Sequence, residues 1–433
     1  MMWCPDTPIP GKAGTIFSLS AILPPVSLAC GLAKARDLKG GHENIIAVIG
    51  DGSLSGGEAY EGLSNAGEMG TNLIIVVNDN EMSIAENHGG LYQNLKELRD
   101  TEGRSSCNFF RSLGLDYLYV GEGNDIPSLI AAFAKVKDTS RPTVVHIHTQ
   151  KGKGYAPAEA DREEFHWEMP FDLETGKPKV DCSGMEDYHS LTGKFLLEKM
   201  KEDHTVVAIS SGTPTVIGFT PERRKQAGRQ FVDVGIAEEH AVALASGIAA
   251  GGGRPVYGVY STFIQRCYDQ LSQDLCINGN PAVITVFMGT VAGMNDVTHL
   301  GFFDIPLISN IPNMVYLAPT CSEEYFAMLE WAVRQTEYPV AIRVPGAAVV
   351  HRKEEFDTDY SELNRYKMTA RGETVAILAL GSFYDLGQAL KNKLREESGV
   401  EATLINPRYI TGLDEPMLEE LKVGHRIVVT LED

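Results

Sequence analysis

The feature that most constrains the fold is a strand, turn, helix and strand pattern within the first hundred residues. An apolar run, Asn44–Ile49, ends in Gly50-Asp51-Gly52, and a helical segment follows over about Glu58–Glu68. A second apolar run, Leu73–Val77, then ends in Asn78-Asp79-Asn80. Two strands joined through a helix form a βαβ unit, and their carboxyl ends lie at the same edge of a parallel sheet. The chain is therefore predicted to be an α/β protein built on doubly wound parallel sheets.

The two turns of this unit carry oxygen ligands. Asp51 and Asn80 follow neighbouring strands, so their side chains are expected at the same sheet edge. A carboxylate and an amide oxygen suit Mg²⁺, and Gly52 lets a diphosphate approach the backbone closely. The alternative is an ordinary crossover in which Asp51 and Asn80 only cap helices. Because both turns carry such groups, we favour a site for Mg²⁺ and a diphosphate.

The sequence of these turns resembles a known cofactor motif. Gly50-Asp51-Gly52-Ser53, followed by Asn78-Asp79-Asn80-Glu81-Met82-Ser83-Ile84, is similar to the thiamine-diphosphate motif of the transketolase superfamily. The local sequence resembles the 1-deoxy-D-xylulose-5-phosphate synthase family in particular, and this resemblance extends over nearly all of residues 26–433. The resemblance implies two thiamine-diphosphate-binding domains with parallel sheets and a partial C-terminal α/β domain.

The resemblance also implies cofactors and a reaction. Asp51, Asn80 and the Met82 carbonyl would hold Mg²⁺, and Gly52, Ser53 and Asn80 would contact thiamine diphosphate. The enzyme would be a transferase that condenses pyruvate with glyceraldehyde 3-phosphate, with loss of CO₂. The product would be 1-deoxy-D-xylulose 5-phosphate, a precursor of isoprenoids, thiamine and pyridoxal.

A glycine-rich basic stretch follows a later strand. Lys151-Gly152-Lys153-Gly154-Tyr155 comes after the apolar run Thr143–Thr149, with Phe165-His166-Trp167 further on. By itself, such a stretch is equally typical of a solvated basic turn. The resemblance assigns Tyr155 to the cofactor site and places Lys153 and His166 beside it.

Glu238 lies at a predicted strand-to-helix turn, in Ile236-Ala237-Glu238-Glu239-His240. Acidic residues are common at helix N-termini because they complement the helix dipole. The resemblance instead gives Glu238 a catalytic role, as the carboxyl group that hydrogen-bonds the aminopyrimidine ring of thiamine diphosphate. It also predicts that Phe263 stacks on that ring and that Arg266 reaches the substrate, although Phe263 alone would indicate core packing.

Two further residues complete the site by resemblance. His299 is a candidate proton shuttle or substrate contact, although a lone histidine is more often structural, and Arg343 is a candidate phosphate-binding guanidinium. One position departs from the family pattern, because Met288 stands where an arginine binds the acceptor's phosphate. Losing a buried charge-assisted contact costs on the order of 2–5 kcal/mol, so the identity of the phosphorylated acceptor stays open.

The strand and helix pattern predicts five regions along the chain. We expect an atypical, non-native start followed by a truncated diphosphate-binding domain, a linker, a pyrimidine-binding domain and a partial C-terminal domain, over residues 1–25, 26–167, 168–189, 190–346 and 347–433. The family's Gly-His turn and the histidines upstream of it are absent from this sequence, and its glycine-rich continuation beyond Asp433 is absent too. The chain is therefore expected to be truncated at both ends.

Net charge and cysteine usage bear on the binding partners of the protein and on its cellular compartment. A net charge of −20 argues against nucleic acid and anionic membranes as partners. The seven scattered cysteines, an odd number without a CxxC pair, favour reduced thiols in the cytoplasm. The sequence has no apolar run long enough for a membrane span. A homodimer is expected, since folds of this kind bury large apolar faces between subunits.

Two other functions stay open at this point. One is a transketolase-like enzyme with a different acceptor, which the Met288 replacement favours. The other is a catalytically silent fragment, which the absent Gly-His turn favours and which would bind no thiamine diphosphate or would bind it without turnover.

Overall fold

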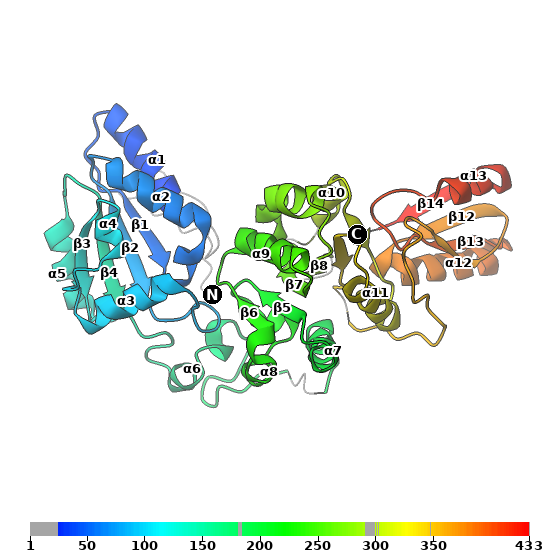
Figure 1. Cartoon of the computed structure of the whole chain (residues 1–433), viewed down its shortest axis with the longest axis horizontal. Coiled ribbons are helices and arrows are strands. Elements are labelled where there is room, and N and C mark those ends of the chain that lie inside the picture. Colours follow the sequence, from blue (N-terminus) through cyan, green and yellow to red (C-terminus); the bar gives the residue numbers. More distant parts are fainter. Residues whose placement is uncertain are drawn as a thin grey trace. The chain divides into compact units, whose positions relative to one another are not determined.

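The computed structural model describes residues 25–180, 184–290, 299, 301, 303–346 and 348–432. The chain forms two compact units, shown in Figure 1. The first comprises the residues up to Gly184 together with Val234–Ala237, and the second comprises Met185–Asp233 together with Glu238–Asp433. The predicted atypical start, residues 1–25, falls almost wholly outside the described residues, and the five predicted regions stay a prediction.

The first unit is built on a four-stranded parallel sheet in the order β1-β2-β4-β3. Its strands are β1 (Ile46–Gly50), β2 (Ile74–Asp79), β3 (Asp116–Val120) and β4 (Thr143–His148). Its helices are α1 (Pro25–Leu38), α2 (Gly57–Glu68), α3 (Gly90–Asp100), α4 (Phe109–Ser112), α5 (Ile126–Val136) and α6 (Ala156–Ala160). The register aligns Gly50 with Asn78, so the predicted βαβ unit is confirmed and its two polar turns start side by side.

The central strand β2 is apolar because helices cover both faces of this sheet. Ile75 and Val77 pack with side chains of α1–α4, whereas Ile74 and Val76 pack with α5. This alternation follows from the two-residue period of a strand. The sheet is therefore a buried layer, and polar chemistry in this unit is confined to the strand ends and loops.

The second unit contains a six-stranded parallel sheet in the order β6-β5-β7-β8-β10-β9. Its strands are β5 (Val206–Ser210), β6 (Phe231–Asp233), β7 (Arg254–Tyr260), β8 (Val283–Phe287), β9 (Val315–Leu317) and β10 (Val340–Arg343). Its helices are α7 (Tyr188–Glu202), α8 (Pro221–Ala227), α9 (Glu238–Ala250), α10 (Asp304–Ser309) and α11 (Ser322–Arg334). The strand and helix alternation predicted for this region is confirmed.

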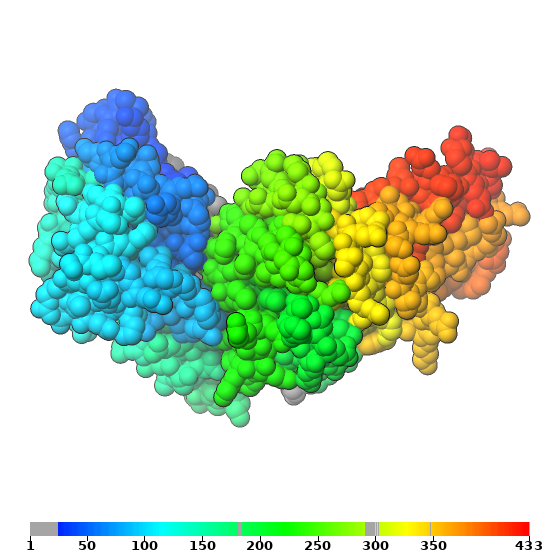
Figure 2. Space-filling model, viewed as in Figure 1, coloured from blue at the N-terminus to red at the C-terminus, as the bar shows by residue number. Residues whose placement is uncertain are grey.

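A third sheet, in the order β11-β13-β12-β14, belongs to the same unit. It comprises β11 (Lys367–Ala370), β12 (Thr374–Ala379), β13 (Thr403–Asn406) and β14 (His425–Leu431), with helices α12 (Tyr384–Ser398) and α13 (Glu415–Gly424). In the space-filling view these elements, in orange and red, continue directly from the yellow residues that precede them (Figure 2). Strand β11 runs antiparallel to β13 and was not predicted, because its sequence, Lys-Met-Thr-Ala, has no clear apolar alternation.

The segment Thr262–Cys276 is helical, but it is not a regular α-helix. The segment forms a 3₁₀ turn at Ile264–Cys267 and then a π-helix at Gln270–Ile277, which packs against α9. Its buried residues Cys267, Leu271 and Leu275 recur every fourth position, a spacing that fits an α-helix and a wider turn alike. Apolar spacing therefore cannot distinguish the two, and π-turns are often found near functional sites.

The expectations about membrane spans and about reduced cysteines can be compared with the described residues. No helix in the described part of the chain is long and apolar enough to cross a bilayer. The five cysteines that the structure describes, Cys30, Cys107, Cys267, Cys276 and Cys321, are all free thiols.

A buried carboxyl group ties the third sheet to helix α11. Glu324 is 1% exposed and accepts hydrogen bonds from the Thr320 amide and hydroxyl, each at 2.8 Å, and from Asn406 Nδ2 at 2.9 Å. Asn406 is the last residue of β13, so this bond joins the two sheet systems of the second unit. A buried carboxyl group that loses a donor destabilises the fold.

We predict that Asn406→Ala lowers the free energy of unfolding by about 1–3 kcal/mol, because Glu324 loses a buried donor. Urea titration followed by tryptophan fluorescence measures this, since Trp331 lies in α11 itself. Gln388→Ala, which removes an exposed carboxamide from α12, is the matched control. Equal unfolding midpoints for the two variants would contradict the prediction.

Candidate cofactor and substrate site

The carboxyl group of Asp51 is buried at the end of β1. The residue is 1% exposed, its amide donates to the Asn78 carbonyl at 3.1 Å, and its Oδ2 accepts from Asn87 Nδ2 at 2.7 Å. Burial, together with the charge of Asp79, raises the pKa of Asp51 to about 7. A cation at this position would favour the ionised carboxylate and so relieve this cost.

The second turn lies against the first. Asn80 Oδ1 accepts from the Met82 amide at 3.2 Å, and a backbone hydrogen bond joins Asn80 to the Asp51 carboxyl group. Gly52 is required here, because a Cβ at this position would lie 2.6 Å from Ser83 Cβ. Gly52 and Ser53 begin the short 3₁₀ turn Gly52–Ser55. The structure therefore brings the predicted metal and diphosphate residues to one edge of the first sheet.

A buried network behind this edge was not predicted from the sequence. Asp79 is fully buried and accepts from Arg99 at 2.5 Å and from His146 Nε2 at 2.9 Å, while His146 Nδ1 pairs with the Tyr117 hydroxyl at 2.7 Å. Burial raises the pKa of Asp79, but the His146 hydrogen bond and the Arg99 charge outweigh it and lower that pKa to about 2. Asp79 thus stays ionised next to Asn80. A histidine inside the apolar strand Thr143–His148 was the available signal.

The two lysines of the basic loop after β4 have different surroundings. Lys153 is exposed and lies 3.4 Å from Gln150 Oε1, whereas Lys151 Nζ donates to the Ser83 carbonyl at 2.7 Å. Burial lowers the pKa of Lys151 to about 8. Lys151 therefore fastens the turn that carries Met82.

The aromatic residues of the same loop pack on one another. The Tyr155 ring contacts Phe165 and Phe171, with ring centroids 5.7 and 5.9 Å apart. His166 is exposed and ends the short 3₁₀ turn Glu164–His166. The cofactor roles predicted for Lys153, Tyr155 and His166 stay predictions.

Glu238 is the first residue of α9 and is 1% exposed. Arg266 donates to its Oε2 at 2.9 Å and also lies 3.2 Å from Glu239 Oε1. Burial raises the pKa of Glu238 to about 7, although Arg266 opposes this. The carboxyl group can therefore exist both protonated and ionised near neutral pH. Arg266, predicted to reach the substrate, is held by these two glutamates.

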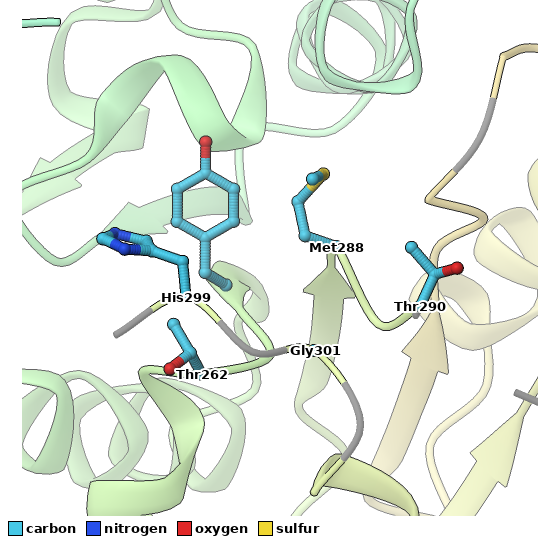
Figure 3. Close-up of a pocket in the computed structure, with 6 residues that line it drawn as sticks. Thr262, Met288, Thr290, His299 and Gly301 are labelled. Atoms are coloured by element: carbon cyan, nitrogen blue, oxygen red, sulfur yellow. The ribbon is translucent and has the colours of Figure 1, made fainter. Parts of the chain in front are cut away.

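The second unit contains a small pocket at the carboxyl ends of β7 and β8. It is lined by Tyr260, Thr262, Met288, Thr290, His299 and Gly301. Figure 3 shows Met288 at the tip of β8, with His299 and Gly301 approaching from a later segment. The Phe263 ring contacts those of His299 and Tyr260 at centroid distances of 5.4 and 5.6 Å. His299 thus lines the pocket, and Phe263 packs against two residues of the lining, His299 and Tyr260.

The backbone at this pocket is unusual. Met288 has a φ of 58°, in the left-handed region that non-glycine residues seldom adopt. Strained backbone of this kind is found mainly at functional sites. Gly301 packs directly on it, since a Cβ there would lie 1.8 Å from the Met288 carbonyl oxygen. The neighbouring positions 291–298 lie outside the described residues.

Arg343, predicted to bind a phosphate, is 6% exposed and lies beneath the pocket rather than in its lining. Its Nε donates to Asp304 Oδ2 at 2.8 Å and its NH2 group donates to the Gly301 carbonyl at 3.3 Å. Asp304 was missed in the sequence because an acidic residue at a helix start has an ordinary explanation.

The raised pKa of Glu238 makes a prediction about stability and pH. The folded-state pKa, about 7, lies above the ordinary value of 4.5, so the folded protein binds an extra proton between these values. Above pH 7 the buried carboxyl group is ionised, which destabilises the folded protein. As the pH falls below 7 the group takes up a proton, and this destabilisation is lost.

We expect the free energy of unfolding of the wild type, relative to Glu238→Gln, to rise by up to about 3 kcal/mol from pH 8 to pH 5. Parallel urea titrations of the two proteins measure this difference, because other titrating groups cancel. A difference that is independent of pH would contradict it.

Comparisons with known proteins agree with this architecture. Residues 17–106 match a family model described as 1-deoxy-D-xylulose-5-phosphate synthase. Residues 186–349 match the pyrimidine-binding domain of transketolase, and residues 365–433 match the transketolase C-terminal domain. A transketolase structure from Pichia stipitis superposes with a TM-score of 0.50 at 15% identity, over 95% of this chain and 75% of that one, which shows the fold alone.

Curated relatives are more similar in sequence. A 1-deoxy-D-xylulose-5-phosphate synthase from Lachnoclostridium phytofermentans is 35% identical over 444 residues, covering 94% of this chain and 70% of the relative. The synthase from Clostridium beijerinckii is 36% identical over 448 residues, covering 94% and 71%. The predicted fold class and resemblance are confirmed, and the chain belongs to the 1-deoxy-D-xylulose-5-phosphate synthase family.

Proposed function

We propose that this protein is a thiamine-diphosphate-dependent transferase that condenses pyruvate with glyceraldehyde 3-phosphate to 1-deoxy-D-xylulose 5-phosphate, with release of CO₂. Membership of the synthase family supports the reaction. The observation that carries the proposal in the structure is the buried Asp51 carboxyl group, joined to Asn80 at the ends of two paired parallel strands.

The residues at this edge fit Mg²⁺ with a diphosphate. The described residues contain no group of three or more His, Cys, Asp or Glu side chains that could hold a metal ion, so a transition-metal centre is not indicated there. Asp51, Asn80 and the Met82 carbonyl form an all-oxygen set, which suits Mg²⁺ because this ion prefers oxygen ligands and binds substrate phosphates alongside few protein groups. In this proposal Asp51 is ionised once the cation is bound.

Thiamine diphosphate, when bound, supplies a nucleophilic carbon that takes up the carbonyl carbon of pyruvate and lets CO₂ leave. Glu238 would donate a hydrogen bond from its protonated carboxyl group to a nitrogen of the pyrimidine ring. Its pKa of about 7 allows it to be protonated near neutral pH. Phe263 supports His299 and Tyr260 through ring contacts. His299 faces the pocket and is suited to move a proton to or from the substrate.

We carry three further properties over from the family as part of this proposal. They are a homodimeric assembly, a cytoplasmic location, and the absence of nucleic acid and membrane partners. The net charge of −20 and the free cysteines among the described residues support the last two.

We predict that Asp51→Asn weakens binding of thiamine diphosphate with Mg²⁺ by about a hundredfold or more, because it removes the only carboxylate of the predicted metal set. Isothermal titration of the purified chain measures this affinity. Asp100→Asn, which alters an exposed acid on α3, is the matched control. Binding without formation of 1-deoxy-D-xylulose 5-phosphate, or no binding by the folded wild type, would favour the silent fragment.

A second prediction concerns the acceptor. If the acceptor is phosphorylated, Met288→Arg should lower its KM by about tenfold or more, because a guanidinium at the pocket lining gains a charged hydrogen bond. The KM of unphosphorylated D-glyceraldehyde should not change. Met288→Gln, similar in length and uncharged, should give no such gain. An equal change for both acceptors would show that the side chain at position 288 does not contact the phosphate and would contradict the prediction.

A further inference from the structure

A buried ion pair lies directly beneath the substrate pocket of the second unit. Asp304, the first residue of α10, is fully buried, and Arg343, the last residue of β10, is 6% exposed. Arg343 Nε donates to Asp304 Oδ2 at 2.8 Å. Burying two charges is costly, so such a pair is retained where its geometry or its specificity matters.

Two residues from other strands of the sheet also hold the pair. Tyr316, in β9, donates its hydroxyl proton to Asp304 Oδ2 at 2.5 Å. Ser261, which follows β7, donates to Asp304 Oδ1 at 3.3 Å. Asp304 thus receives donors from the ends of β7 and β10 and from the middle of β9. Its position is fixed by the sheet rather than by the short helix that it begins.

The pair reaches the pocket through two glycines. A Cβ at Gly289 would lie 2.9 Å from Arg343 Nε and 3.1 Å from Asp304 Oδ2, so the backbone beside Met288 rests on the ion pair. Arg343 also donates to the Gly301 carbonyl at 3.3 Å, and Gly301 packs against the Met288 carbonyl. Three of the residues that line the pocket, Met288, Thr290 and Gly301, are therefore supported from this side.

This arrangement differs from that of a phosphate-binding arginine. A guanidinium that binds substrate offers its N–H groups to the pocket, whereas here Nε donates to a buried carboxylate and the NH2 group donates to a backbone carbonyl. Arg343 is also absent from the described lining of the pocket. The positive charge of Arg343 is neutralised by Asp304 in the protein without substrate.

We propose that Asp304 and Arg343 are positioning residues, whose buried ion pair sets the left-handed turn at Met288 and the backbone at Gly301, and that Arg343 does not bind the acceptor's phosphate. This inference rests on the proposed function for its kinetic consequences. Its structural part, the fixing of the pocket backbone, holds for the ligand-free protein too.

The kinetic test compares two acceptors in Arg343→Lys and Asp304→Asn. Lysine keeps the charge but cannot bridge Asp304 and the Gly301 carbonyl together. We expect kcat/KM to fall by about a hundredfold with glyceraldehyde 3-phosphate and with D-glyceraldehyde alike, because a misplaced pocket affects both. Arg334→Lys, at an arginine with a 75% exposed side chain, is the matched control and should behave as wild type.

Two kinetic outcomes would overturn the proposal. A loss confined to the phosphorylated acceptor would show that Arg343 contacts the phosphate. A lower unfolding temperature with unchanged kcat/KM for both acceptors would show that the pair only stabilises the fold. Should Asp304→Asn fail to fold, Tyr316→Phe removes one donor from the same carboxylate, and a smaller loss shared by both acceptors is expected.

Hydrogen exchange separates this inference from the proposed function. Peptides that contain Met288 or Gly301 should exchange faster in Asp304→Asn than in Arg334→Lys, while peptides from β5 should not change. If the wild type has no synthase activity, the proposed function fails, and this comparison still decides the positioning role. Equal exchange at Met288 and Gly301 in both variants would refute it.

Discussion

The pairing of β1 with β2 is the constraint on which the proposed cofactor site at the edge of the first sheet depends. Parallel register sets Gly50 opposite Asn78, and the Asp51 amide continues the ladder to the Asn78 carbonyl. Two turns that are distant in sequence are thereby brought into contact, and Gly52 permits their close approach to Ser83. The residues proposed to bind metal and diphosphate lie on these turns, so they are held in place by a sheet that helices cover on both faces.

Buried charges at strand ends are the second common element. Asp79 with Arg99 and His146, Glu238 with Arg266, and Asp304 with Arg343 each combine an acid with a cationic partner inside the protein. Burial by itself favours the neutral form of a carboxyl group, as the raised pKa of Asp51 and Glu238 illustrates, whereas His146 and Arg99 lower the pKa of Asp79. Each pair therefore fixes the position of its carboxyl group within its own unit.

Much of the fold could be predicted because its signals are local. Apolar runs such as Leu73–Val77 and glycine-bearing turns predicted the parallel strands and their order along the chain, and these are confirmed. Strand β11 was missed because its sequence has no clear apolar alternation, and the spacing of apolar residues in Gln270–Ile277 could not distinguish a π-helix from an α-helix. The contact of Lys151 with the Ser83 carbonyl could not be predicted, because nearby lysines in one loop differ only in what the folded chain places beside them.

The sequence by itself determined the family, the class of fold and the two acidic turns, because these depend on residue type and local order. Tertiary structure alone decided which charges are used internally. Arg266 and Arg343 have the same chemistry as substrate-binding arginines, yet the fold places Glu238 against one and Asp304 against the other. Charge pairing depends on distances of a few ångströms between residues far apart in the chain, and such distances exist only once the sheets have formed.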